Sequence, residues 1–171
     1  MNQLEHFKQI TTFIFDVDGV LTNSQVLVLE DGKLLRSMNV KDGYALKKAL
    51  EKGYRVCIIT GGESEGVKIR LQNLGIKDIY LGQSDKMEAF EEYLYLYDLN
   101  PKNILYMGDD LPDVPVMKKV ALAACPRDAA PEVIDTSNYV SGVLGGQGCA
   151  RDVIEKVMRV QGKWETQKVS E

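Results

Sequence analysis

The sequence predicts an α/β protein built on a Rossmann-like, doubly wound parallel sheet with a projecting β-hairpin. Short apolar runs alternate with longer amphipathic stretches along almost the whole chain. Uninterrupted apolar runs are typical of parallel strands that are buried on both faces. Several of the runs end directly in acidic or small polar residues. Strands that alternate with helices in this way define the doubly wound class.

Six apolar runs are interpreted as strands. They lie at residues 12–15, 56–59, 79–81, 104–107 and 120–123, with a weaker one at 138–140. The amphipathic stretches between them are interpreted as helices, because their length and periodicity suit helices better than strands. These helices are expected near residues 42–52, 63–74, 85–97, 112–118, 129–134 and 149–160.

One segment interrupts this alternation just after the first strand. Residues 24–40 form two extended arms around Asp31-Gly32, a dipeptide that strongly favours a tight hairpin turn. We therefore expect a β-hairpin that projects from the sheet. The whole chain, residues 1–171, is predicted to be one domain, because its length fits one domain and it contains no linker. Residues 161–171 are expected to form a polar tail.

Composition excludes several classes of function. The chain is 44% hydrophobic and 27% charged with a net charge of −4, so a basic surface for nucleic acid is not expected. Its only histidine, His6, lies in a polar leader, which excludes a Ser-His-Asp triad and a histidine-rich zinc centre. Three cysteines without a C-x-x-C pair, no signal peptide and no apolar run of membrane-spanning length predict a cytoplasmic protein. Cys57 is expected in the core, and Cys125 and Cys149 near turns with partial exposure.

Polar residues follow four of the predicted strands. The segments are Asp16–Thr22 after the first strand, Thr60-Gly61-Gly62 after the second, Asp85-Lys86 after the third and Gly108–Asp113 after the fourth. The carboxyl ends of parallel strands share one edge of a sheet, where ligands of α/β proteins bind. We therefore expect these four segments to meet at one site.

The residue types at this edge indicate phosphoryl transfer with a divalent cation. Clustered carboxylates repel one another unless a cation neutralises them, and oxygen ligands alone favour Mg²⁺. Asp16 is the candidate nucleophile and a metal ligand. Asp18 is the candidate acid and base, and it offers its backbone carbonyl to the metal. Asp109 is the second metal ligand, with Asp110 and Asp113 in support.

Further residues of these segments are candidates for binding the phosphoryl group. Thr60 and the backbone N–H groups near Gly61 can hold its oxygens, and the charge of Lys86 offsets Asp16 and the developing anion. Each signal alone is weak, since an isolated lysine is usually solvated and Gly-Asp-Asp is a common helix cap. Lys41 can face the site, while its neighbour Asp42 can equally serve as a helix N-cap.

Together these motifs resemble those of the haloacid dehalogenase superfamily. The resemblance covers nearly the whole chain and implies a Rossmann-like core, Mg²⁺ and an aspartyl-phosphate mechanism. It favours a phosphatase because an aspartate occupies position 18. Only 43 residues separate Asp16 from Thr60, and 25 separate Thr60 from Lys86, so neither interval holds a cap domain. A site without a cap is open to water, and the substrate is then enclosed by a large partner or a second subunit.

A finer resemblance is to the capless phosphatases that act on 3-deoxy-D-manno-octulosonate 8-phosphate (KDO 8-phosphate) in lipopolysaccharide sugar synthesis. It rests on residues 15–22, 39–44, 82–86, 108–110, 115–117 and 145–148. It implies a homotetramer in which hairpins pack together and a neighbouring subunit closes each site. It also implies that Arg70 reaches the adjoining site and pairs with the carboxylate of the sugar acid.

Two other functions remain open at this point. A relative in the same subgroup acts on 2-keto-3-deoxynononate 9-phosphate, and an acidic residue is expected after Thr-Gly in that case. Gly62 occupies this position here and favours the eight-carbon substrate. A receiver-like domain that accepts a phosphoryl group without turnover also uses clustered Asp, Thr and Lys around Mg²⁺. In receivers, however, the acidic pair precedes the phosphorylated aspartate, whereas Asp109-Asp110 comes last here.

Overall fold

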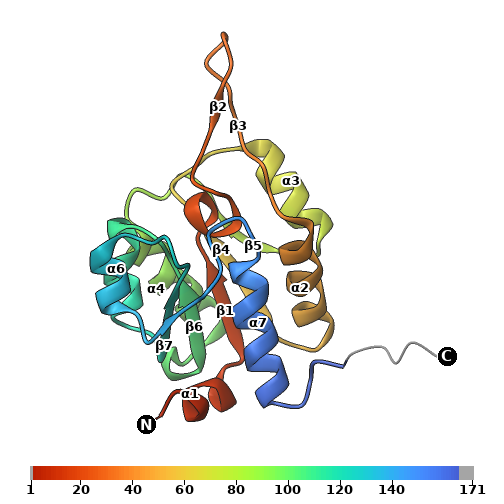
Figure 1. Ribbon diagram of the computed structural model, residues 1–171, viewed down its shortest axis with the longest axis vertical. Coiled ribbons are helices and arrows are strands. Elements are labelled where there is room, and N and C mark those ends of the chain that lie inside the picture. Colours follow the sequence, from red (N-terminus) through yellow and green to blue (C-terminus); the bar gives the residue numbers. More distant parts are fainter. Residues whose placement is uncertain (1, 166–171) are drawn as a thin grey trace, which may run out of the picture.

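A six-stranded parallel sheet forms the centre of the molecule in the computed structural model, which describes residues 2–165 (Figure 1). The strand order is β5-β4-β1-β6-β7-β8. The strands are β1 (Thr12–Phe15), β4 (Arg55–Ile59), β5 (Asp78–Tyr80), β6 (Ile104–Met107), β7 (Leu122–Cys125) and β8 (Tyr139–Val140). The predicted doubly wound α/β class is therefore confirmed, with every expected strand present.

Helices cover both faces of the sheet. They are α1 (Gln3–Gln9), α2 (Val40–Glu51), α3 (Glu65–Asn73), α4 (Lys86–Tyr97), α5 (Val114–Met117), α6 (Pro131–Thr136) and α7 (Cys149–Val160). One core cluster joins the sheet to α1, α2, α3 and α7, and the other joins it to α4, α5 and α6. Figure 1 shows α2 and α7 on one side of β1 and α4 and α6 on the other. None of these helices is long and apolar enough to cross a membrane.

The central strand β1 positions the candidate site. All four of its residues are buried, because β1 lies between β4 and β6 and is covered on both faces. Phe15 pairs with Ile58 of β4 and with Met107 of β6, so these three strands end at nearly the same level. From β1 the chain continues to β4 and β5 on one side, and then crosses to β6 on the other side of β1. The strand order therefore reverses at β1, and the carboxyl end of β1 is the topological switch point where such sheets bind ligands.

The predicted hairpin projects from this edge of the sheet (Figure 1). Its strands are β2 (Leu27–Val28) and β3 (Leu34–Leu35), and the turn contains Gly32 with a φ of +85°. Glycine adopts this conformation without the steric cost that a Cβ would impose. The Leu29 N–H donates to the Lys33 carbonyl at 2.9 Å and closes the hairpin.

Some local expectations were wrong. Residues 3–9, taken as a polar leader, form α1, whose N-terminus carries a capping box between Asn2 and Glu5 and whose Phe7 enters the core. His6 of this helix is half-buried. Cys125 and Cys149 are fully buried, like Cys57. Of the polar tail expected at residues 161–171, residues 166–171 lie outside the described residues.

Candidate active site

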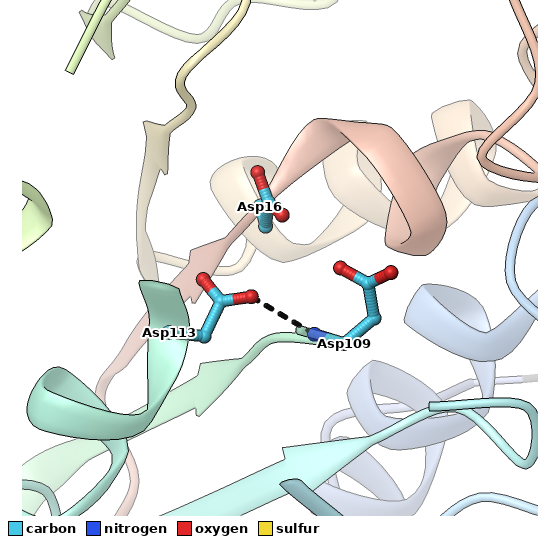
Figure 2. Close-up of side chains that lie close together, drawn as sticks. All are labelled: Asp16, Asp109 and Asp113. Atoms are coloured by element: carbon cyan, nitrogen blue, oxygen red, sulfur yellow. Dashed lines mark hydrogen bonds between the residues drawn. The ribbon is translucent and has the colours of Figure 1, made fainter. Parts of the chain in front are cut away.

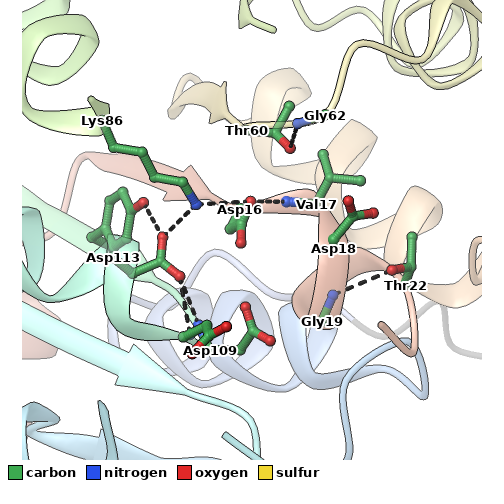
Figure 3. A network of polar contacts seen from close by, with 12 residues as sticks. Asp16, Val17, Asp18, Gly19, Thr22, Thr60, Gly62, Lys86, Asp109 and Asp113 are labelled. Atoms are coloured by element: carbon green, nitrogen blue, oxygen red, sulfur yellow. Dashed lines mark hydrogen bonds and ion pairs between the residues drawn. The ribbon is translucent and has the colours of Figure 1, made fainter. Parts of the chain in front are cut away.

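The four predicted segments come together at the carboxyl edge of the sheet (Figure 3). Asp16 directly follows β1, Thr60 follows β4, and Asp109 lies two residues after β6. Lys86 is the first residue of α4, which begins at the N-cap Asp85. Thr60 is buried, and its hydroxyl accepts a hydrogen bond from the Gly62 N–H at 3.2 Å. Parallel strands therefore deliver residues from four distant parts of the chain to one place.

A buried ion-pair chain forms the centre of this cluster. The Lys86 ammonium lies 3.0 Å from Asp16 Oδ1 and 2.7 Å from Asp113 Oδ1. The side chains of the three residues are at most 8% exposed. The Val17 N–H also donates to Asp16 Oδ1, at 2.7 Å. These contacts occupy one oxygen of Asp16 and leave Oδ2 turned towards the rest of the site.

Asp113 organises the loop that carries Asp109. Its Oδ1 accepts a hydrogen bond from the hydroxyl of Tyr106 at 2.6 Å, in addition to Lys86. Its Oδ2 accepts from the backbone N–H groups of Asp109 at 2.9 Å and of Asp110 at 3.3 Å. The sequence did not indicate Tyr106, although a tyrosine within a buried strand requires a polar partner for its hydroxyl.

Oxygen atoms of Asp16, Asp109 and Asp113 lie within 4.8 Å of one another (Figure 2). Two of these residues, Asp16 and Asp113, are buried, and Asp109 is half-buried. Three carboxylates at this spacing fit a hard divalent cation, because such a cation prefers oxygen ligands. The side chain of Asp110 instead accepts a hydrogen bond from the Leu111 N–H at 2.8 Å and caps a helical turn, so it lies outside this group.

The electrostatics of the cluster indicate a need for positive charge. Burial, followed by repulsion from Asp113, raises the pKa of Asp16 from 3.8 to about 6. Burial, followed by repulsion from Asp16 and Asp113, raises the pKa of Asp109 to about 8. Burial opposes the charge of Lys86, but the two carboxylates outweigh it and raise its pKa. One lysine therefore does not balance the acidic groups, and a bound cation would.

This imbalance predicts a pH-dependent effect of Mg²⁺ on stability. A carboxyl whose pKa is raised in the folded state binds more protons folded than unfolded, so the free energy of unfolding falls as pH rises through that interval. For Asp16 and Asp109 the interval begins near 3.8 and ends at about 6 and about 8. Saturating Mg²⁺ should raise the melting temperature by about 5 °C or more at about pH 8.

At about pH 5 the same Mg²⁺ concentration should raise the melting temperature much less, because protons compete for the ligands. Thermal unfolding followed by circular dichroism, with Mg²⁺ or with a chelator, measures both shifts. Equal shifts at the two pH values would contradict the assignment of these carboxylates as ligands.

Gly19 allows Asp109 to approach Asp16. A Cβ at this position would overlap the Asp109 carboxylate, and the φ of Gly19 is +89°. The Gly145-Gly146 turn packs against the same segment, and a Cβ on Gly145 would overlap the carbonyl oxygen of Gly19. The glycines near residue 145 therefore serve close backbone packing around the first motif.

The Asp18 side chain lies at the mouth of the site and pairs with a residue that the sequence did not indicate. Arg36, just after β3, donates from Nε to Asp18 Oδ1 at 2.7 Å and from Nη2 to Oδ2 at 3.1 Å. Arg36 comes from the hairpin, 18 residues along the chain, and no sequence pattern connects it with Asp18. A contact of this kind depends on how the hairpin folds back over the sheet.

A groove of about 990 Å³ begins at Asp18 and runs between the hairpin and the N-terminal half of α3. Gly61 and Arg70 line it, as does Arg36. Its volume suits a small-molecule ligand. Lys41, expected to contact the substrate, is instead exposed at the start of α2 and is not among the residues that line the groove within the described chain.

Asp42, the neighbour of Lys41, is buried and accepts a hydrogen bond from the Arg151 N–H of α7 at 2.9 Å. It is not the N-cap of its own helix, because Asn39 fills that position. Asp42 therefore joins α2 to α7.

Fold and site define a class of protein. A parallel α/β sheet with an aspartate after β1, a second aspartate two residues on, a lysine at the start of α4 and an acidic loop after β6 is the arrangement of the haloacid dehalogenase-like hydrolases. The family model of that description matches residues 75–150. The 3-deoxy-D-manno-octulosonate 8-phosphate phosphatase of Escherichia coli K12 is 40% identical over 91% of this chain and 83% of its own length.

Solved structures agree with this result. The phosphatase of the same name from Yersinia pestis superposes with a TM-score of 0.91 at 35% identity, over 94% of this chain and 86% of that one. The enzyme from Moraxella catarrhalis, in complex with magnesium ion, phosphate ion and KDO, gives a TM-score of 0.90 at 30% identity over 93% and 91%. The chain belongs to the family of 3-deoxy-D-manno-octulosonate 8-phosphate phosphatases.

Proposed function

We propose that the protein is a Mg²⁺-dependent phosphatase that hydrolyses KDO 8-phosphate to KDO and inorganic phosphate. The observation that carries this proposal is the cluster of buried Asp16, Lys86 and Asp113 with half-buried Asp109 at the edge of the sheet. Relatives of the same name, one of them in complex with magnesium, phosphate and KDO, support both the reaction and the substrate.

Asp16 is the nucleophile in this proposal. Its Oδ1 is held by Lys86 and the Val17 N–H, so Oδ2 attacks phosphorus and forms an aspartyl phosphate. As the bond to the sugar oxygen breaks, Asp18 donates a proton to that oxygen. Asp18 then takes a proton from water, which attacks the aspartyl phosphate at phosphorus. This step releases inorganic phosphate and restores the Asp16 carboxylate.

Neighbouring groups hold the phosphoryl oxygens. The Thr60 oxygen accepts from the Gly62 N–H, which leaves its own proton free to donate to the phosphoryl group. Lys86 and the N–H groups near Gly61 add to this stabilisation of negative charge. Asp16, Asp109 and the Asp18 carbonyl would hold Mg²⁺, with Asp113 in support, whereas Asp110 is engaged as a helix cap. The bound cation supplies positive charge that offsets the carboxylates and the phosphoryl oxygens.

A kinetic comparison of two sugar-acid phosphates tests the substrate assignment. We expect kcat/KM for KDO 8-phosphate to exceed that for 2-keto-3-deoxynononate 9-phosphate by about tenfold or more, a difference of about 1.4 kcal/mol in transition-state binding. Equal values, or the reverse order, would assign the protein to the nine-carbon substrate or to a broader range of sugar phosphates.

Arg70 is the proposed partner of the substrate carboxylate, which we expect it to contact in the site of an adjoining subunit. It lines the groove, and its Nη2 lies 2.8 Å from the position of a Cβ on Gly43, so the guanidinium rests against α2. Arg70→Ala should raise KM for KDO 8-phosphate about tenfold or more, because a charged partner is lost. The KM for p-nitrophenyl phosphate, which has no carboxylate, should not change. If the variant hydrolyses KDO 8-phosphate like the wild type, Arg70 is not part of the pocket.

The exposed hairpin favours assembly into a homotetramer. Leu27 and Val28 are 63% and 64% exposed, and Leu34 and Leu35 are 42% and 48% exposed. Apolar side chains on both arms of a projecting hairpin fit burial against other copies of the chain. A neighbouring subunit placed there would also cover the groove beside the hairpin.

Leu27→Glu should therefore dissociate the assembly, because it places a charge in the apolar contact. Light scattering coupled to size-exclusion chromatography gives the mass of the particle. Tyr95→Glu is the matched control, since Tyr95 is 91% exposed on α4, away from the hairpin. A wild-type protein that runs as a monomer at micromolar concentration would contradict the proposed tetramer.

A further inference from the structure

The carboxylate of Asp18 is oriented by a single side chain. Arg36 makes two parallel hydrogen bonds to it, at 2.7 and 3.1 Å. Among residues 2–165, no other group donates a hydrogen bond to this carboxylate. Two parallel bonds from a planar guanidinium fix both the position and the plane of a carboxylate.

The Arg36 guanidinium is enclosed by the surrounding residues, and the turn at Gly62 leaves room for it. Its side chain is only 7% exposed, whereas that of Asp18 is 38% exposed. A Cβ at position 62 would lie 3.0 Å from Arg36 Nη2 and 3.4 Å from Asp18 Oδ2. The absence of a side chain at Gly62 therefore provides the space that the ion pair occupies. The backbone angles of Asp18 and Gly19 are not helical, so both residues interrupt the helical turn that follows Asp16.

We propose that Arg36 is a positioning residue for the reaction, which holds the Asp18 carboxylate where it exchanges a proton with the leaving oxygen of the substrate. The inference rests on the proposed function, in which Asp18 is the acid and base. A buried cation that is more enclosed than the carboxylate it binds can fix that carboxylate while leaving its outer face open to the groove. The hairpin thereby contributes directly to the chemistry.

Leaving groups of different basicity test this role. An alkyl phosphate requires a proton on its leaving oxygen, whereas p-nitrophenolate leaves without one. For each substrate kcat/KM reports the steps up to formation of the aspartyl phosphate. The three substrates are KDO 8-phosphate, a simple alkyl phosphate without a carboxylate, and p-nitrophenyl phosphate.

Arg36→Met should lower kcat/KM for both alkyl phosphates by about 100-fold, the effect of a misplaced catalytic group. The same variant should change the value for p-nitrophenyl phosphate less than about threefold. Arg36→Lys retains the charge but not the two parallel bonds, so it should give an intermediate loss for the alkyl esters. Equal losses for all three substrates would reduce Arg36 to a structural residue. A loss confined to KDO 8-phosphate would make it a ligand of the substrate carboxylate instead.

Two further variants keep the test decisive. Lys77→Met removes an exposed cation just before β5, outside the residues that line the groove, and should leave the ratios among the three substrates unchanged. Gly62→Ala presses on the guanidinium from the neighbouring turn and should shift the ratios in the same direction as Arg36→Met, but less. If Gly62→Ala and Arg36→Met shift the ratios in opposite directions, the positioning role is wrong. If the wild-type protein hydrolyses none of the three esters, the proposed function itself is wrong.

Discussion

Asp16→Asn should abolish turnover of KDO 8-phosphate while the protein remains folded. An amide is a poor nucleophile and cannot form the aspartyl phosphate, so we expect kcat to fall by about 10⁴-fold or more. The fold should tolerate the change, because Asn has nearly the same shape and its neutral side chain avoids both the burial of a charge and the repulsion from Asp113, which raise the pKa of Asp16. Steady-state kinetics and thermal unfolding of the same preparation measure the two effects.

Asp110→Asn is the control for this variant. Asp110 belongs to the same acidic segment, but it is exposed, and it accepts the hydrogen bond from the Leu111 N–H as a helix cap. An asparagine can still make this bond, so turnover should stay within a few-fold of the wild type. Substantial activity in Asp16→Asn would show that another residue, or water itself, attacks phosphorus.

Lys86→Met should have the largest effect on stability. The methionine has a similar volume but removes the only buried cation between Asp16 and Asp113 in the described chain. Breaking a buried ion pair from one side leaves an uncompensated charge, which costs about 3–5 kcal/mol. Chemical denaturation gives the free energy of unfolding, and we expect a decrease of about this size together with loss of turnover.

The pH dependence of Lys86→Met distinguishes charge from packing. Without the lysine, the pKa of Asp16 rises further above its unfolded value, so the free energy of unfolding should fall more steeply between about pH 5 and about pH 8 than in the wild type. Lys77→Met, at an exposed position before β5, is the matched control and should change stability by less than about 0.5 kcal/mol. Destabilisation by Lys86→Met that is independent of pH would indicate a packing defect.

The sequence was sufficient to predict the fold because the strands of a doubly wound sheet are continuous apolar runs. The least accurate strand was the one predicted at 120–123, which in the structure is Leu122–Cys125. Alanine and cysteine favour strands only weakly, whereas valine favours them strongly. The predicted strand therefore began at Val120, which lies in the turn before the observed strand. Helix α1 was missed although Asn2 and Glu5 have the spacing of a capping box, because only Phe7 of this short helix is buried.

The site could be predicted in part. The residues that were predicted differ from those that were missed for a physical reason. The positions of Asp16, Lys86 and Asp109 follow from the ends of parallel strands, which local patterns reveal. The contacts of Arg36 with Asp18 and of Tyr106 with Asp113 depend on packing between segments and have no local signature. Lys41 shows the converse. Its closeness to the hairpin in sequence suggested a contact with the site, but the residue is exposed at the start of α2 and does not line the groove within the described chain.

Chemical trapping of the intermediate tests the central claim most directly. Borohydride reduces an aspartyl phosphate to homoserine, and mass spectrometry of peptides from protein quenched during turnover locates the modified residue. We expect homoserine at position 16, only when KDO 8-phosphate and Mg²⁺ are both present, and not in Asp16→Asn. Turnover without modification at position 16, or with modification at another aspartate, would contradict the assignment of Asp16 as the residue that accepts the phosphoryl group.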